Sequence, residues 1–279
     1  MTWFWIALVT PLAHAAVNHI DKHLISKYLK GGEVGSLVLF SALFAVCALP
    51  IIALIDHGVF SISTRDVVIL MINGGLLVLA YICYFYALEK DEASFVAPLF
   101  QIIPVLGFVL GYFILGETIT LIESLGSLVV IVGAVILALD VSGVKIGLKK
   151  AVFFLMLGSS ALYALNGVLF KFVAETQQRF WPSLFWDFLG KVAFGILIFL
   201  AVKSYRRQFL AVLKENRFSI LAMNSINEVL AILVLVFGFF GWLGNTRDLL
   251  VGWLPGQLRS FRTVARWSFL RQVAVTCGY

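Results

Sequence analysis

The fold is decided by residues 81–139, which read YICYFYALEKDEASFVAPLFQIIPVLGFVLGYFILGETITLIESLGSLVVIVGAVILAL. This stretch contains two apolar runs, Phe95 to Leu115 and Ser124 to Leu139, joined by the turn Gly116-Glu117-Thr118. A third apolar run, Val67 to Leu88, overlaps its start. Since an α-helix rises about 1.5 Å per residue, about 20 apolar residues cross a hydrocarbon core about 30 Å thick. The stretch therefore predicts membrane-spanning helices.

The composition of the whole chain indicates the same environment. Of its 279 residues 61% are hydrophobic and 13% are charged, and the mean hydropathy is +1.01. So few polar side chains cannot cover a soluble globule of this size. The net charge of +6 does not indicate a nucleic-acid partner, because the basic residues lie in short loops between apolar runs, as the positive-inside rule describes. The three cysteines have neither a disulfide framework nor a metal-ligand spacing, and no cofactor is expected.

Eight apolar runs are long enough to be membrane spans. The first has no Lys or Arg before it, which favours an uncleaved span over a signal peptide. The predicted spans are Trp3–Lys27, Val34–Ile55, Val67–Leu88, Phe95–Leu115, Leu121–Leu139, Ala151–Ala174, Ser183–Val202 and Phe218–Phe240.

Short motifs around the third, fourth and fifth spans resemble one transporter family. They are, in order, Tyr86-Ala87-Leu88, Ala93-Ser94, Pro104, Gly116-Glu117, and the glycines Gly126 and Gly133. At this spacing they resemble the EamA branch of the drug/metabolite transporter superfamily, over residues 1 to about 240. The resemblance implies an all-α polytopic membrane protein with a ten-helix fold, made of two inverted five-helix repeats. It also implies a carrier that moves a small metabolite, such as an amino acid or a related compound, through a cavity between the halves.

Short sequence matches indicate an internal duplication. Asn73 matches Asn224, Asn18 matches Asn166, and Ser36-Leu37 matches Ser183-Leu184, all at an offset of about 150 residues. Because each unit has an odd number of helices, the second copy must enter the membrane in the opposite sense. The predicted domains are a first five-helix repeat at 1–140, a partial second repeat of three helices at 141–240, and an atypical tail at 241–279.

The distribution of basic residues predicts an orientation. Ten basic residues follow the odd-numbered spans: Lys30, Lys90, Lys145, Lys149, Lys150, Lys203, Arg206, Arg207, Lys214 and Arg217. The loops on the other side hold only Arg65 and Arg179. The odd-numbered loops are therefore expected in the cytoplasm and the N-terminus outside, in a plasma or inner membrane. Ten-helix members of the family that the chain resembles are often described with the opposite orientation.

The tail departs from the pattern of the first repeat. Residues 241–279 contain five Arg and no Lys, and no window of about 18 uncharged apolar residues. Two interpretations stay open. The tail is either an ending foreign to the family, such as a shifted reading frame, or an interfacial amphipathic helix with Arg259, Arg262 and Arg266 on one face.

Polar side chains inside apolar runs are the candidates for function, because a charge in mid-bilayer costs roughly 2.5 to 3.5 kcal/mol. The strongest is Glu228, halfway along its span, with Asn224 one turn earlier and Asn227 beside it. Asp187 and Lys191 lie four residues apart, so they either pair with each other or contact a substrate.

The remaining candidates lie in spans one, three, four and six. In span one a polar face runs through His14, Asn18 and Lys22; alternatively, Lys22 snorkels to the interface. Gln101 lies near Pro104, which is expected to free a backbone carbonyl near Phe100. The full set of expected cavity-lining residues is His14, Asn18, Lys22, Asn73, Gln101, Asn166, Asp187, Lys191, Asn224, Asn227 and Glu228.

These features predict a secondary transporter rather than an enzyme. No nucleotide-binding loop, nucleophile elbow or HExxH motif is present. Alternating access is expected, with Glu228 distinguishing the two states. Expected partners are a small metabolite, the lipid bilayer and a second copy of the chain in a homodimer. Two alternatives are a membrane metalloenzyme that uses the span-one histidines and a truncated fragment that does not transport.

Overall fold

The computed structural model describes residues 2–28, 34–91, 102–116, 150–177, 179–214 and 218–243, together with scattered positions between 96 and 132. All regular structure in these residues is helical. The elements are α1 (Thr2–His23), η1 (Leu24–Tyr28), α2 (Val34–Phe44), η2 (Ala45–Cys47), α3 (Ala48–Ile55), α4 (Thr64–Lys90), α6 (Ile102–Leu115), α8 (Lys150–Gln177), α9 (Phe180–Ala201), α10 (Lys203–Lys214) and α11 (Phe218–Leu243).

Within the described part of the chain, four helical segments are long and apolar enough to cross a membrane: Val34–Ile55, Thr64–Lys90, Lys150–Ala174 and Phe180–Ala201. Shorter apolar helices occupy Ile102–Leu115 and Ala222–Leu233. The prediction of an all-α, multi-pass membrane protein is therefore confirmed. The counts of eight spans and ten helices stay predictions, because most of the span predicted at 121–139 and the tail beyond 243 lie outside the described residues.

The turn that closes α6 also matches its prediction. The helix ends at Leu115, and Gly116 follows with a φ of 67°, in the left-handed region that glycine adopts without a Cβ clash.

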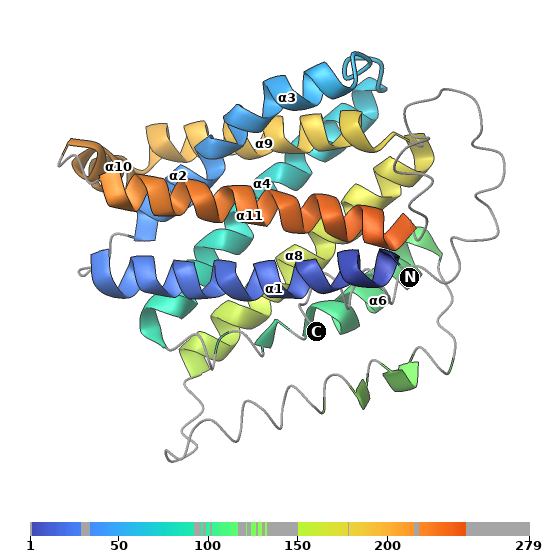
Figure 1. Cartoon of the computed structure of the whole chain (residues 1–279), viewed down its shortest axis with the longest axis horizontal. Helices are drawn as coiled ribbons and strands as arrows, with labels where there is room; N and C mark the ends of the chain where they lie inside the picture. The colour runs from blue at the N-terminus through green and yellow to red at the C-terminus, as the bar shows by residue number, and fades with distance from the viewer. Residues whose placement is uncertain are drawn as a thin grey trace.

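The long helices lie side by side in one bundle (Figure 1). Helix α1 packs on α11, α4 packs on both α8 and α9, and α2 packs on α9. The predicted duplication makes α8, α9 and α11 the counterparts of α1, α2 and α4. In Figure 1 each counterpart runs opposite to its partner along the bundle. The contacts are reciprocal as well, because the first helix of each set packs on the third helix of the other.

Helices α4 and α9 cross at backbone contact. A Cβ added to Gly74 would clash with the Asp187 carbonyl and the Lys191 amide, and one added to Gly190 would clash with the backbone of Met71. Small residues allow membrane helices to approach this closely. The crossing therefore brings the middle of α4 against the middle of α9, where several polar side chains lie.

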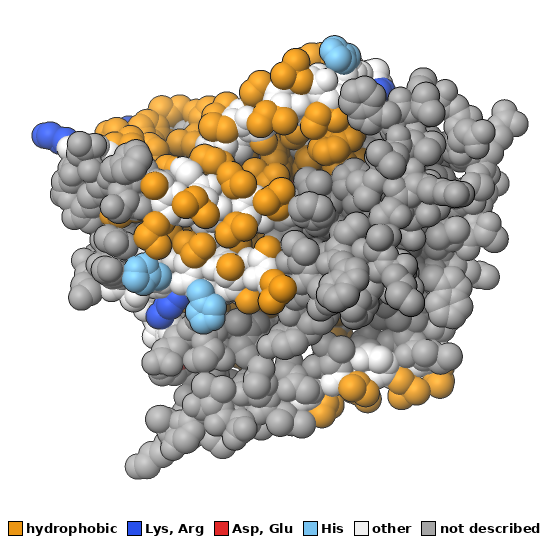
Figure 2. All heavy atoms as spheres, viewed as in Figure 1, with side chains coloured by type: hydrophobic (Ala, Val, Ile, Leu, Met, Phe, Trp, Pro, Cys, Tyr) orange, Lys and Arg blue, Asp and Glu red, His pale blue; other side chains and the backbone are white. Residues whose placement is uncertain are grey.

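The outer surface of the bundle is apolar. Figure 2 shows hydrophobic side chains covering most of the described part of one face. Leu54, Phe113 and Leu200 are among the large exposed side chains. A soluble protein rarely exposes apolar patches of this extent, so this surface is suited to lipid.

The loop between α3 and α4 is tied to the start of α9. Arg179 forms an ion pair of 3.2 Å with Asp56 and also donates to Ser61. The Trp186 indole Nε1 donates to the Val59 carbonyl at 2.8 Å. These contacts hold the two loops at this end of the bundle together.

Replacing Trp186 with Phe is expected to lower the free energy of unfolding by about 1 kcal/mol. The ring packing of Trp186 on Phe60 would largely persist, but the buried Val59 carbonyl would lose its donor. Thermal unfolding of the purified protein in detergent measures the change. A melting temperature equal to that of the wild type would show that the hydrogen bond contributes nothing.

Candidate functional site

The centre of the bundle holds a buried ion pair between α9 and α11. Lys191 Nζ lies 3.4 Å from Glu228 Oε2 and 3.4 Å from the Tyr81 hydroxyl. The ammonium also lies 4.8 Å from the centroid of the Tyr81 ring, a cation–π distance. Lys191 and Glu228 are each only 5% exposed. Buried charges need such partners, because isolated charges in a medium of low dielectric constant are very costly.

A second acid lies beside this pair, on α1. Asn227 Nδ2 donates to Asp21 Oδ1 at 2.6 Å. The Tyr84 hydroxyl lies 3.1 Å from Asp21 Oδ2 and 3.1 Å from Asn18 Oδ1, so it can donate to either oxygen. Among the described residues, the buried Asp21 carboxylate therefore has two hydrogen-bond partners, both neutral donors, one from α11 and one from α4.

A third acid, Asp187, lies at the α4–α9 crossing. Asn73 Nδ2 donates to Asp187 Oδ1 at 2.8 Å, and Asn166 Nδ2 donates to the Asn73 carbonyl at 3.1 Å. Asp187 does not form the ion pair with Lys191 that their spacing allows. The close crossing of α4 and α9 places Asn73 beside Asp187, and the packing of α11 places Glu228 beside Lys191.

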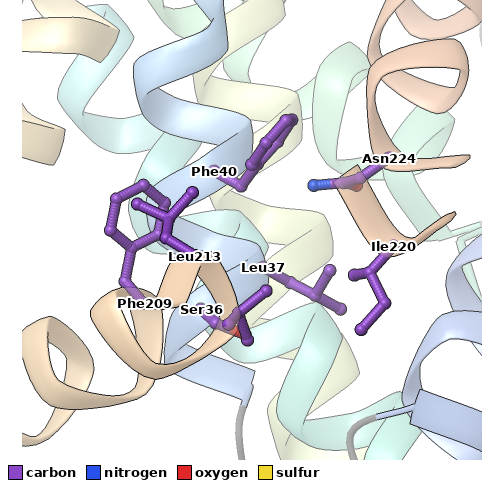
Figure 3. A pocket seen from close by; sticks show the side chains of 8 residues that line it. Ser36, Leu37, Phe40, Phe209, Leu213, Ile220 and Asn224 are labelled. Atoms are coloured by element: carbon purple, nitrogen blue, oxygen red, sulfur yellow. The ribbon is translucent and has the colours of Figure 1, made fainter. Parts of the chain in front are cut away.

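Asn224 lines a crevice at one end of the bundle, between α2, α10 and α11. The crevice is narrow, and much of the empty space of about 260 Å³ around it is open to solvent. Figure 3 shows the Asn224 side chain pointing toward Phe40 across it. The other lining residues are Ser36, Leu37, Phe209, Val212, Leu213 and Ile220. Asn224 thus lies one turn from Glu228, toward the end of the bundle that carries α10.

Three of the expected residues lie apart from this group or cannot be placed. Lys22 donates to the carbonyls of Leu88 at 2.9 Å and Asp91 at 2.7 Å, so it caps the end of α4. His14 belongs to α1, but its side chain lies outside the described residues, and so does Gln101.

Pro104 does not free the carbonyl expected near Phe100. It stands in the first turn of α6, where the backbone N–H of any residue would lack a helical partner. The Phe100 carbonyl accepts from the Ile103 amide at 2.9 Å.

Sequence reasoning missed Asp21, Tyr81 and Tyr84 as members of the site. Asp21 is three residues after Asn18 and therefore on the same helical face, which was a usable signal. The tyrosines carry no such signal, because aromatic residues are common throughout membrane helices. Only their contacts with Lys191 and Asp21 identify them.

The site is acidic and has unsatisfied hydrogen-bond acceptors. It holds three buried carboxylates, Asp21, Asp187 and Glu228. The buried amide oxygens of Asn73, Asn224 and Asn227 accept no hydrogen bond from the described residues. Since an unpaired buried polar atom is costly, these oxygens are available to a polar solute or to water.

Metal chemistry has no support in the described part of the chain. There, no group of three His, Cys, Asp or Glu side chains lies close enough to hold a metal ion. His19 and His23 are exposed on α1. The arrangement can bind charge and hydrogen-bonding groups, and nothing in it indicates a nucleophile.

Comparison with known proteins gives matches to part of the chain. Residues 1–139 match the EamA-like transporter family. An uncharacterized transporter from Clostridium kluyveri is 32% identical over 133 residues, which cover 47% of this chain and 42% of the relative. An uncharacterized protein from Methanocaldococcus jannaschii is 34% identical over 70 residues, 25% of this chain and 51% of the relative. The matches thus span about half the length of these relatives or less, and α9 and α11 lie outside the family match.

Proposed function

Since residues 1–139 of this chain match the EamA-like transporter family, we propose that the chain is a secondary carrier of a small polar metabolite across the plasma membrane. The observation that carries the proposal is the buried Lys191–Glu228 ion pair between two membrane helices. A charged pair at this depth has a high cost and is typical of a solute or ion pathway. The apolar surface of the bundle and its membrane-spanning helices support the same conclusion.

The helix arrangement supports alternating access as the mechanism. The sets α1–α2–α4 and α8–α9–α11 run in opposite senses and pack reciprocally, which is how inverted repeats surround a central site. The Lys191–Glu228 pair lies within the second set. From the first set, Tyr81 contacts Lys191, and Asp21 binds Asn227, the neighbour of Glu228 in the chain. Rocking of one set against the other would change these contacts and open the site to either side.

The chemistry of the site favours a zwitterionic solute such as an amino acid or a related compound. A solute carboxylate would replace Glu228 at the Lys191 ammonium, and a solute ammonium would bind Glu228 or Asp21. The free amide oxygens of Asn73 and Asn227 would accept further hydrogen bonds from the solute. Exchanging one ion pair for another avoids the cost of leaving either protein charge unpaired.

Uptake into proteoliposomes tests the proposal. Wild-type protein is expected to take up at least one radiolabelled amino acid faster than empty liposomes, at a rate that varies with pH. Glu228→Gln removes the carboxylate that pairs with Lys191, so its uptake is expected to be slower and to lose that pH dependence. Glu89→Gln, in the last turn of α4, removes a carboxyl outside the site and is expected to behave like the wild type.

Two results would count against the proposal in different ways. No uptake of any tested metabolite above empty liposomes would remove the carrier function. Uptake by Glu228→Gln with the pH dependence of the wild type would leave the carrier function in place but remove Glu228 from the role of switching group.

A further inference from the structure

Helix α10 is a strongly basic helix that the proposed transport function does not use. The sequence places residues 203–214 in a loop, and the structure makes them a helix that reads KSYRRQFLAVLK. Four of its 12 residues are Lys or Arg, and none is Asp or Glu. A helix of this composition is typical of the membrane surface.

The position of α10 places it at the end of the bundle. Helix α9 ends at Ala201, and the extended backbone of Val202, with φ −102° and ψ 92°, turns the chain before α10 begins. The helix packs mainly on α2, where Gly35 at the start of α2 lies against Tyr205 and Gln208. Helix α10 therefore lies at the level where α9 leaves the hydrocarbon core. Figures 1 and 2 show this end on the left, where a basic side chain projects beside hydrophobic ones.

The two faces of α10 differ in chemistry. Its inner face is apolar, with Val212 buried and Phe209 half-buried against the crevice. Its outer face is centred on Lys203, Arg207 and Lys214, which are spaced so that they align along the helix and are all exposed. The outer face is thus opposite the packed face and open to the surroundings.

The cations of α10 are not used within the described structure. No described residue forms an ion pair or a side-chain hydrogen bond with Lys203, Arg206, Arg207 or Lys214. Leu210 and Leu213 lie among them and are 49% and 42% exposed. Basic side chains beside exposed leucines match a lipid surface, where the cations meet phosphate groups and the leucines enter the acyl boundary.

We propose that the outer face of α10 binds the headgroups of anionic phospholipids and anchors this end of the bundle to the membrane surface. Charge complementarity selects this partner, because juxtamembrane Lys and Arg are attracted to anionic leaflets. The same helix forms one wall of the Asn224 crevice, so lipid bound on α10 would hold that wall in place. The inference requires only a membrane-embedded bundle and is independent of transport.

Nanodiscs of defined composition test the proposal with the whole chain. Wild-type protein is expected to melt about 5 °C higher in discs with 30% phosphatidylglycerol than in discs of phosphatidylcholine alone. The variant K203Q/R207Q/K214Q is expected to lose most of this gain and to retain fewer phosphatidylglycerol molecules in native mass spectrometry. High salt should reduce the gain of the wild type, because the attraction is screened.

Two controls separate a specific surface from general attraction. Arg65 is exposed at the opposite end of the bundle and meets the same lipid in a symmetric disc, but it lies outside α10. If binding is specific to α10, R65Q should keep the gain in melting temperature, whereas R207Q should reduce it. The charge-preserving variant K203R/R207K/K214R should also keep it. The proposal is overturned if the triple glutamine variant keeps the full gain, if R65Q loses as much as R207Q, or if the wild type gains nothing.

Discussion

Replacing Gly74 with alanine is expected to lower the free energy of unfolding by about 3 kcal/mol, and leucine should prevent folding. A Cβ at this position would clash with the backbone of Asp187 and Lys191, and backbone atoms cannot rotate away as a side chain can. Helices α4 and α9 would have to separate, which would also break the hydrogen bond from Asn73 to Asp187. Thermal unfolding and size-exclusion chromatography in detergent measure the effect.

Two other glycines provide matched controls for this substitution. Gly158 of α8 has no atom within 4 Å of an added Cβ, so Gly158→Ala should be neutral or slightly stabilising through helix propensity. At Gly75 the added Cβ lies 3.1 Å from the flexible Phe194 ring, and alanine should have an intermediate effect. A Gly74→Ala variant as stable as Gly158→Ala would show that the helices do not cross at backbone contact.

Replacing Lys191 with methionine is expected to cost about 3 to 5 kcal/mol, because it leaves the Glu228 carboxylate buried without its cation. Lys191 is the only described partner of Glu228 in an ion pair, and both side chains are 5% exposed. Methionine fills a similar volume, so the loss would come from charge rather than from a cavity. Unfolding of the purified variant and its solute uptake are the two measurements.

A double-mutant cycle distinguishes this effect from lost packing. The variant Lys191→Met/Glu228→Met has no unpaired charge at this position, and it should recover most of the stability. Its transport should stay absent, because the proposed solute contacts are gone. If the two single losses simply add in the double variant, the two side chains are not coupled and the ion pair has no role in stability.

The sequence was sufficient to predict the class of fold and the extent of most described helices. The run Val67–Leu88 lies within α4, Ser183–Val202 nearly coincides with α9, and Gly116 ends α6 as expected. Such predictions succeed because lipid offers no hydrogen bonds, so that a spanning segment must be a helix of about 20 apolar residues. The basic helix α10 was missed because hydropathy does not report a short amphipathic helix at the membrane surface.

The sequence also identified polar candidates such as Glu228, Lys191 and Asp187, because a charged residue within an apolar run needs no structure to be noticed. It could not determine their partners. Lys191 pairs with Glu228 rather than with Asp187, and Asp21 binds Asn227, which lies 206 residues further along the chain. The physical reason is that these contacts join different helices. Local chemistry sets the length and polarity of each helix, whereas the packing of one helix on another, at glycines such as Gly74 and Gly190, decides which side chains meet.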